Sequence, residues 1–414
     1  MKAEIISIGT ELLLGETLNT NAYFLARELQ NLGIESYFQT TVGDNIKRIH
    51  EVLKKATDRS DLIITTGGLG PTSDDLTHEA ISSFFKTNLA LDKVVLRQIK
   101  KKFYLKGYKK MPKINKKQAY KPKNAKWISN KLGTANGIIW KMNALHPKII
   151  LTFPGVPKEM NQMWNDTARL YLKKIADKNV IYSKTLKFTG IGESAIAEKI
   201  KPYFNLKNPT VAPYASIGEV KIRVTAKTKT SVQGKKLVMP IVKKILSKTK
   251  QYYFGEDEET LEELVAKKLL QKKKTIAVAE SCTGGFLSKR LTDISGSSKF
   301  VKLNIVTYSN EAKNKILNVP TELLKKFGAV SHQVASAMAV GIKNLAKTNI
   351  GLSITGIAGP TGGSNTKPVG LVYFGLAYKN KVQTRKVLFG SNSIREEIRW
   401  LATQYALNWL RQEL

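Results

Sequence analysis

The chain has 414 residues, of which 42% are hydrophobic and 24% are charged, and its formal net charge is +36. This length predicts two or three domains, and the composition excludes a disordered or low-complexity protein. The sequence has no run of about 18 apolar residues, the length that a transmembrane helix needs. The N-terminus, MKAEIISIGT, lacks the apolar stretch of a signal peptide, and a lone cysteine cannot form an internal disulfide. We therefore expect a cytoplasmic protein without a membrane partner.

Lysine supplies most of the positive charge and crowds the segment from Lys100 to Lys126. Asp and Glu are absent from Lys93 to Lys158, so this surface could attract nucleic acid. However, no helix-turn-helix, zinc-finger or RNP pattern accompanies the lysines. We interpret them as solvated surface residues and expect no nucleic-acid partner, although their charge would favour phosphorylated small substrates.

The first 90 residues predict strands that alternate with helices. The apolar periodicity indicates strands at 3–9, 34–43 and 61–68, and helices at 22–33 and 46–60. This alternation is typical of a mostly parallel sheet with helices on both faces. In such a sheet the ligand crevice lies beyond the carboxyl ends of the strands.

The loop TGGLGPTSDD, from Thr66 to Asp75, falls at that edge. Its glycines let backbone N–H groups point at phosphate oxygens, and two adjacent carboxylates suit a divalent cation that also touches phosphate. Ser73-Asp74-Asp75 could equally be a simple helix N-cap. The candidate phosphate and metal site consists of Glu11, Asn21, Gly67, Gly68, Thr72, Asp74 and Asp75, with Asp74 and Asp75 as the metal ligands.

The middle of the chain changes character. Residues 215–228 alternate with period two, as a strand does, and a basic helix follows at 239–250. The acidic stretch FGEDEET then separates this small α+β module from a third unit. We predict domains at 1–170, 171–254 and 255–414.

The stretch AESCTGG, Ala279 to Gly285, follows a buried strand and opens a helix. Free N–H groups at Thr283 and Gly284 would favour a phosphate or an oxyanion. A Cys282 nucleophile would need a histidine, and His332 has no obvious orienting partner, so a buried packing role suits Cys282 better.

Ser281 has a better base than Cys282. In TYSNEAK, Tyr308 ends the next strand and Lys313 begins a helix, so both would project at the same crevice. A desolvated lysine with a lowered pKa can activate a serine. Lys313 could also be an ordinary surface lysine.

A third loop, ITGIAGPTGGSNTKPVG, predicts a further wall of this crevice. Thr355 ends a strand, and Gly356, Gly359 and Gly362 follow in a flexible cradle. Three loops at successive strand ends favour a binding pocket over a plain surface connection.

These motifs resemble those of one protein family. GTELLLGETLNTN, TGGLGPTSDDLT, KLGTANGI and PGVPKEM are similar to the molybdopterin-binding-like domain of the CinA (competence/damage-inducible) family. AESCTGG, TYSNEAK, GAVSHQVASAMA and TGIAGPTGGSNTKPVG resemble its C-terminal domain, which also occurs alone as nicotinamide-mononucleotide amidohydrolase. The resemblance implies an α/β fold in three parts: a three-layer molybdopterin-binding-like domain, a small α+β connector and an α/β amidase domain.

For the C-terminal domain, the resemblance implies hydrolysis of nicotinamide mononucleotide to nicotinate mononucleotide and ammonia, without a cofactor. Ser281 would be the nucleophile and Lys313 the base, with Tyr308 assisting it. The implied substrate-binding residues are Thr283, Gly284, Ser309, Asn310, Thr355, Gly356, Gly359, Gly362 and Arg395, of which Arg395 suits a phosphate. A homodimer is also implied, and the small residues of the helix face from Val334 to Gly341 are compatible with one.

For the N-terminal domain, the resemblance implies hydrolysis of ADP-ribose with Mg, Mn or Co, so both activities would recycle pyridine nucleotides. The chain departs from the family pattern at Asn136, where proline is usual, and at Leu303-Asn304, where a Gly-Gly pair is usual. Two alternatives stay open: a non-catalytic competence or DNA-damage factor that binds protein or DNA, and a pterin binder.

Overall fold

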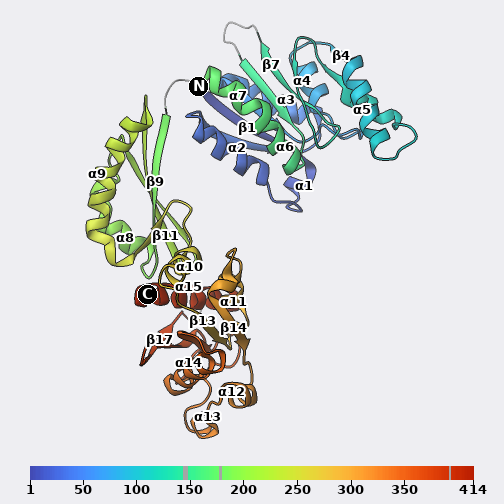
Figure 1. The fold of residues 1–414 in the computed structure, drawn as a ribbon. Coiled ribbons are helices and arrows are strands. Elements are labelled where there is room, and N and C mark those ends of the chain that lie inside the picture. The colour runs from blue at the N-terminus through green and yellow to red at the C-terminus, as the bar shows by residue number, and fades with distance from the viewer. Residues whose placement is uncertain (143–147, 177–179, 391–392) are drawn as a thin grey trace. The chain divides into compact units, whose positions relative to one another are not determined.

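The computed structural model describes residues 1–142, 148–176, 180–390 and 393–414 (Figure 1). The chain forms two compact units. One comprises Met1–Tyr182 with Lys227–Lys235, and the other comprises Ser183–Ala226 with Lys236–Leu414. The predicted connector is therefore packed largely with the C-terminal part of the chain.

The first part of the chain alternates strands and helices as predicted. Its elements are β1 (Lys2–Ile8), α1 (Thr10–Leu13), α2 (Thr20–Asn31), β2 (Glu35–Val42), α3 (Ile46–Arg59), β3 (Leu62–Thr66), α4 (Thr77–Phe84), β4 (Leu89–Leu91), α5 (Lys93–Leu105), β5 (Tyr120–Pro122), β6 (Lys126–Ile128), β7 (Gly137–Met142), β8 (Lys148–Phe153), α6 (Pro157–Met163) and α7 (Arg169–Ile175). Asn19 caps α2, because its side chain accepts a hydrogen bond from Ala22 N.

A six-stranded sheet in the order β2-β1-β3-β8-β7-β6 organises this part. The strands β2, β1, β3 and β8 are parallel. Next to them, β7 pairs antiparallel with β8, and β6 pairs antiparallel with β7. Successive residues of β1 point to opposite faces, so Ile5 packs with α2 and α6 while Ile6 packs with α3 and α4. Helices therefore cover both faces, which confirms a three-layer α/β domain.

The middle segment contains β9 (Val180–Phe188), α8 (Glu193–Ile200), β10 (Thr210–Ser216), β11 (Glu219–Thr228), α9 (Ser231–Thr249) and β12 (Tyr253–Glu256). These strands form a sheet in the order β10-β11-β9-β12. Along β11, buried residues alternate with more exposed ones, as the period-two pattern predicts.

The C-terminal segment again alternates strands and helices. Its elements are α10 (Leu261–Gln271), β13 (Ile276–Glu280), α11 (Phe286–Thr292), β14 (Val301–Val306), α12 (Asn310–Leu317), α13 (Thr321–Phe327), α14 (His332–Ala346), β15 (Ile350–Gly356), β16 (Leu371–Tyr378), β17 (Lys381–Leu388) and α15 (Arg395–Glu413). The sheet order is β14-β13-β15-β16-β17. The strands β14, β13 and β15 are parallel, and β16 and β17 form an antiparallel hairpin.

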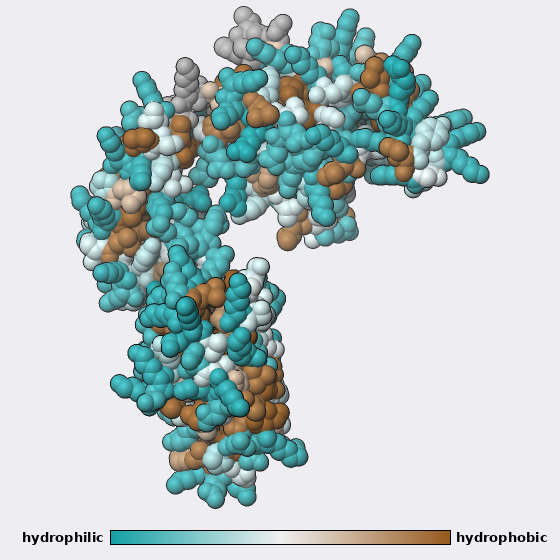
Figure 2. All heavy atoms as spheres, in the orientation of Figure 1, coloured by the Kyte–Doolittle hydropathy of each residue, from teal (hydrophilic) through white to brown (hydrophobic). Residues whose placement is uncertain are grey.

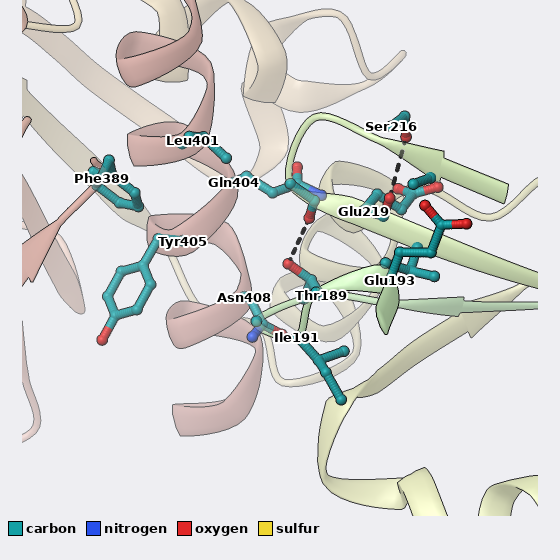
Figure 3. Close-up of a pocket in the computed structure, with 15 residues that line it drawn as sticks. Thr189, Ile191, Glu193, Ser216, Glu219, Phe389, Leu401, Gln404, Tyr405 and Asn408 are labelled. Carbon is teal, nitrogen blue, oxygen red and sulfur yellow. Dashed lines mark hydrogen bonds between the residues drawn. The ribbon is translucent and has the colours of Figure 1, made fainter. Parts of the chain in front are cut away.

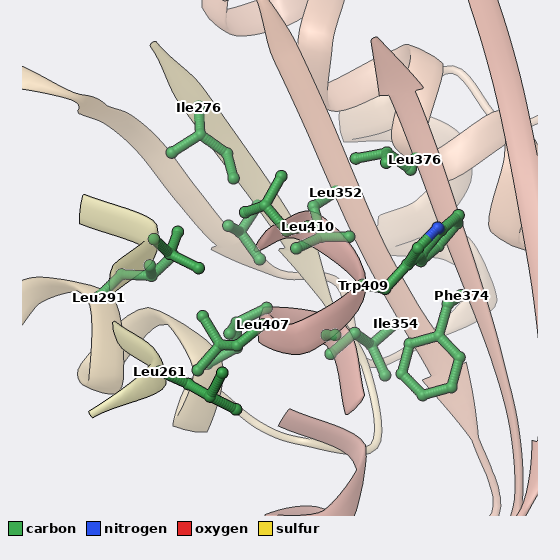
Figure 4. Packing of buried hydrophobic residues seen from close by; sticks show 14 of the residues in the cluster. Leu261, Ile276, Leu291, Leu352, Ile354, Phe374, Leu376, Leu407, Trp409 and Leu410 are labelled. Atoms are coloured by element: carbon green, nitrogen blue, oxygen red, sulfur yellow. The ribbon is translucent and has the colours of Figure 1, made fainter. Parts of the chain in front are cut away.

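Two hydrophobic clusters hold the last sheet between helices. On one face, α10, α11 and α15 pack against the strands, with Trp409, Leu407 and Phe374 in the centre (Figure 4). On the other face, α12, α13 and α14 cover β13 and β14. This packing fixes the first turn of α15 and the start of α12 near the carboxyl ends of the strands, where the candidate active site lies.

The small-residue face of α14 has a different role from the one the sequence suggests. Gly375 lies against Ala335 O and Gly351 lies against Ala339 O, so neither glycine has room for a Cβ. On α14 itself, Gly341 lies against Leu317 O in the same way. Small residues are thus needed for packing inside the domain, and this face offers no support for a dimer contact. The dimer itself stays a prediction.

Hydrophilic residues dominate the surface seen in Figure 2. Among the described residues, none of the helices has the length and apolar character needed to cross a membrane.

Candidate active site

Three loops meet where the parallel strands of the C-terminal sheet end. In the register, Glu280 at the end of β13 lies between Val306 of β14 and Ile354 of β15. The next residues along the two strands β13 and β15, Ser281 and Thr355, therefore emerge side by side. A cavity of about 310 Å³ opens there, lined by Ser281, Cys282, Tyr308, Lys313, Ala329, Val330, Thr355, Gly356, Ile357, Ala358, Gly359, Thr361, Gly362 and Arg395.

Lys313 and Ser281 form the centre of this cavity. The Nζ atom lies 3.1 Å from Ser281 Oγ and donates to the carbonyl oxygens of Thr307 (2.8 Å) and Tyr308 (3.3 Å). Burial lowers the pKa of Lys313 from 10.5 to about 8. A neutral amine has two N–H groups and one lone pair. Because both carbonyls can only accept, they orient the lone pair toward the Ser281 hydroxyl.

Tyr308 contacts Lys313 through its main chain and Arg395 through its side chain. Its main-chain carbonyl holds Lys313, but its hydroxyl accepts a hydrogen bond from Arg395 Nη2 at 3.1 Å. Arg395 Nη1 donates to Gly359 O at 2.8 Å. Tyr308 and Arg395 are both exposed, and together they form one wall at the mouth of the cavity.

Thr355 and the glycine cradle form another part of the lining. Thr355 is buried, and its hydroxyl donates to Ala329 O at 2.9 Å, which leaves its lone pairs for a ligand donor. Gly356, Gly359 and Gly362 line the cavity as predicted. Gly359 and Gly362 have left-handed φ values of +73° and +85°, which side-chain-bearing residues rarely adopt.

The helix start after AESCTGG does not serve as the predicted anion site. The buried Glu280 carboxylate already accepts hydrogen bonds from the main-chain N–H groups of Gly285, Leu287 and Ser288. A carboxylate therefore satisfies the helix start from within the protein. Thr283 is fully buried and Gly284 is exposed, and neither lines the cavity.

Ser309 and Asn310 also lie outside the cavity lining. Ser309 is the N-cap of α12 and accepts from Ala312 N, and Asn310 begins the helix. Their role is to start α12 so that Lys313, in the first turn, reaches Ser281. Sequence reasoning placed them correctly in the motif but assigned them a ligand contact that the structure does not provide.

Cys282 is buried, and desolvation raises its pKa to about 12. His332 faces elsewhere: its Nδ1 lies 2.9 Å from Thr384 Oγ1 and its ring packs against Tyr373. These contacts exclude a Cys282–His332 pair in this conformation and support the packing role for Cys282.

The unusual Leu303-Asn304 pair lies on β14, the edge strand of the sheet. Leu303 packs against the cluster beneath α14, whereas Asn304 Oδ1 is buried without a hydrogen-bond partner among the described residues. Neither residue lines the cavity.

A second cavity, of about 520 Å³, lies at the carboxyl edge of the N-terminal sheet. Of the predicted residues it is lined by Glu11, Gly67, Gly68, Asp74 and Asp75. Gly67 has no room for a side chain, because a Cβ would lie 1.9 Å from Ile8 O.

Asn21 and Thr72 shape this second site without lining it. Asn21 Nδ2 donates to Thr66 Oγ1 (2.9 Å) and Gly155 O (2.8 Å), which joins α2 to the end of β3 and to the loop after β8. The N–H and hydroxyl groups of Thr72 both donate to Asp75 Oδ2.

Asp75 fits poorly as a metal ligand. Its Oδ1 accepts from Gly70 N at 2.7 Å, and its Oδ2 is held by Thr72, so both oxygens are used to form the loop. Asp74 is exposed and its pKa is lowered, so it carries a charge at neutral pH. Within the described ranges, no cluster of three or more His, Cys, Asp or Glu side chains could hold a metal ion.

The structure adds residues that sequence reasoning missed. Lys106 and Glu159 also line the N-terminal cavity. Asn136, in place of the usual proline, accepts from Asn130 N at 2.8 Å, and Asn130 Nδ2 donates to Glu159 at 2.6 Å. Glu159 lies in the PGVPKEM motif, which could have signalled it, whereas Lys106 stands in a lysine-rich segment that hides any single residue.

A third cavity, of about 430 Å³, lies beside α15 and contains none of the predicted site residues (Figure 3). Its walls come from the start of α8, the β10–β11 turn and the side chains of Leu401 and Gln404.

Three family descriptions match successive parts of the chain. They are "Probable molybdopterin binding domain" over residues 4–174, "Damage-inducible protein CinA KH domain" over 183–255 and "CinA C-terminal domain" over 258–414.

Relatives match along the whole chain. The CinA-like protein of Nostoc punctiforme is 50% identical over 417 residues, which cover 100% of this chain and 99% of the relative. The CinA-like protein of Prochlorococcus marinus subsp. pastoris is 47% identical over 410 residues, which cover 99% of this chain and 94% of the relative.

Solved structures match one part each. The competence/damage inducible protein CihA from Agrobacterium tumefaciens is 42% identical with a TM-score of 0.35, and the match covers 36% of this chain and 93% of that one. The protein CinA from Thermoplasma acidophilum is 34% identical with a TM-score of 0.38, covering 41% and 96%. The sequence matches over the full length show that this chain belongs to the CinA-like protein family.

Proposed function

We propose that the C-terminal domain hydrolyses the carboxamide of nicotinamide mononucleotide to nicotinate mononucleotide and ammonia. The observation that carries this proposal is the 3.1 Å contact between Ser281 Oγ and Lys313 Nζ, a buried lysine with a pKa of about 8. The substrate comes from the resemblance of the C-terminal motifs. The cavity suits an anionic ligand, because its charged lining residues, Lys313 and Arg395, are both basic.

In the first half of the reaction, neutral Lys313 accepts the Ser281 proton while Oγ forms a bond to the carboxamide carbon. The carbonyl electron pair moves onto oxygen and creates an oxyanion. The N–H group of Cys282, the residue after the nucleophile, donates to no oxygen among the described residues, and it is our candidate oxyanion donor.

Collapse of this intermediate breaks the C–N bond. The Lys313 ammonium returns its proton to the leaving nitrogen, so ammonia departs and an acyl-Ser281 ester remains. Water then attacks the ester with Lys313 again as the base, which releases the carboxylate and restores the Ser281 hydroxyl. Arg395 would hold the phosphate at the cavity mouth, because its guanidinium suits phosphate oxygens.

The test is ammonia release from nicotinamide mononucleotide by the purified full chain. Ser281→Ala should abolish the reaction, whereas Ser298→Ala, at an exposed serine outside the cavity, should retain it. Full activity of Ser281→Ala would show that the mechanism is wrong. An inactive wild-type protein would instead favour the non-catalytic competence or DNA-damage factor.

As a second function, we propose that the N-terminal cavity binds and hydrolyses ADP-ribose. Its glycine-rich floor and its volume of about 520 Å³ support a pyrophosphate ligand. A bound divalent cation would neutralise phosphate charge, and Asp74 is the residue that fits as its ligand. Because Asp75 is occupied in the loop, we derive no step through the metal, and the metal requirement stays a prediction.

Hydrolysis of ADP-ribose with and without added Mg, Mn or Co tests this second proposal. Asp74→Asn should lower the metal-dependent rate, with Asp58→Asn, an exposed aspartate of α3 outside the cavity, as the control. Tighter binding of molybdopterin than of ADP-ribose, with no hydrolysis, would favour the pterin binder instead.

A further inference from the structure

The turn that carries Ser281 has little rigidity of its own. Gly284 N donates to Ser281 O at 3.1 Å, which closes the turn. Gly284 and Gly285 then adopt left-handed φ values of +59° and +90°. Glycine restricts its backbone least of all residues, so contacts from outside must hold this segment in one conformation.

The downstream end of the turn is held by Glu280. Its carboxylate is fully buried and accepts from Gly285 N (3.1 Å), Leu287 N (3.1 Å) and Ser288 N (2.7 Å). The Ser288 hydroxyl also donates to it. These bonds tie the first turn of α11 to the residue that directly precedes Ser281.

The middle of the turn is held from α15. Arg399 donates to Thr283 O through Nη2 at 2.8 Å and through Nε at 3.2 Å. One helical turn earlier, Arg395 holds Gly359 O and the Tyr308 hydroxyl. Arg399 itself does not line the cavity. The two arginines therefore attach the serine turn, Gly359 and Tyr308 to one helix.

Further contacts fix α15 itself. Its apolar face is buried in the domain core, and Trp400 Nε1 donates to Ile217 O in the β10–β11 turn at 2.9 Å. Leu401 and Gln404 pack against Gly218 of the same turn. Arg399 thus projects from a firmly packed helix, which is what a group that sets the position of another residue needs.

We propose that Arg399 is a positioning residue for Ser281, acting through the Thr283 carbonyl and together with Glu280. The proposal rests on the proposed amidase function. It assigns Arg399 no contact with the substrate. Its guanidinium keeps Ser281 Oγ within reach of Lys313 and keeps the Cys282 N–H directed at the developing oxyanion.

The kinetic test compares Arg399→Ala with the wild-type full chain on nicotinamide mononucleotide. A displacement of about 1 Å at a reacting atom can cost about 100-fold in rate. We expect kcat to fall by about that factor, with KM within about threefold of wild type because the cavity lining is retained. Arg399→Lys should recover part of the rate. The pH midpoint of about 8 should stay in place because Lys313 remains buried.

The control is Arg385→Ala, which removes an arginine from β17 of the same domain, beside Trp409. It should leave kcat unchanged. A rise in KM with unchanged kcat for Arg399→Ala would identify a substrate contact and overturn the proposal. So would an unchanged kcat and KM.

A measurement independent of the substrate separates this inference from the proposed function. Amide hydrogen exchange of the segment 281–288 should become faster in Arg399→Ala and in Arg399→Lys, while exchange of the β13 and β15 amides stays as in wild type. Unchanged exchange in 281–288 would overturn the positioning role even if the enzyme is active. If the wild-type protein shows no amidase activity but exchange in 281–288 is still faster in the Arg399 variants, the positioning role stands. Only the proposed function is then rejected.

Discussion

Lys313 provides the sharpest prediction, because its charge state controls the proposed reaction. At pH 7 a lysine with the ordinary pKa of 10.5 is neutral in about one molecule in 3,000, whereas a pKa of about 8 makes about one in 11 neutral. Burial therefore raises the fraction of active base about 300-fold. Since the neutral form is the base, kcat/KM should rise tenfold per pH unit below a midpoint near 8 and level off above it.

The assay is ammonia release from nicotinamide mononucleotide between pH 6 and pH 10. Lys313→Met keeps the length of the side chain but removes the base, and it should lower kcat by about 100- to 10,000-fold at every pH. Lys313→Arg should be equally inactive, because a guanidinium does not lose its proton in this range. A midpoint near 10.5, a rate independent of pH from 7 to 9, or an active Lys313→Met would refute the reasoning.

Three further predictions concern stability and side-chain roles. The folded-state pKa of Lys313 lies below its unfolded value, so its charged form destabilises the folded protein at pH 7, and this cost disappears as the pH rises from about 8 to 10.5. Lys313→Met should therefore have a higher Tm than the wild-type protein at pH 7. Calorimetry should show this difference in Tm closing above pH 8. Cys282→Ala should retain ammonia release, and the wild-type thiol, with its pKa of about 12, should resist iodoacetamide at pH 8, which mass spectrometry would detect. Asp75→Asn should destabilise the N-terminal domain by about 1–3 kcal/mol because it disrupts the bonds from Gly70 and Thr72, whereas the exposed Asp74→Asn should change its urea midpoint little.

Much of the candidate active site followed from short-range patterns. The sequence predicted a buried strand before AESCTGG and another that ends at Thr355, which are β13 and β15, and parallel strands bring the residues after them to one edge. Ser281, Lys313 and Thr355, which these motifs supplied, line one cavity together with Arg395, which the resemblance supplied. The resemblance to a family supplied the substrate, which periodicity and spacing cannot provide.

Other assignments needed the folded chain because they depend on what satisfies each polar group. A helix start after a glycine turn predicts an anion site. The sequence does not show that the carboxylate of Glu280, the residue before Ser281, accepts the hydrogen bonds of the free N–H groups at the start of α11. Likewise, Asp75 looks like a metal ligand until its oxygens are found to be held by Gly70 and Thr72.

By itself, the sequence determined the alternation of strands and helices and the loops at their ends, because these depend on the spacing of residue types along the chain, and it offered Ser281 and Lys313 as a candidate pair. Only the tertiary structure decided the protonation and the reach of those groups. The lowered pKa of Lys313 comes from side chains packed around it from distant elements. The contact of Arg399 with Thr283 joins residues 116 positions apart, a distance in sequence that no local pattern records.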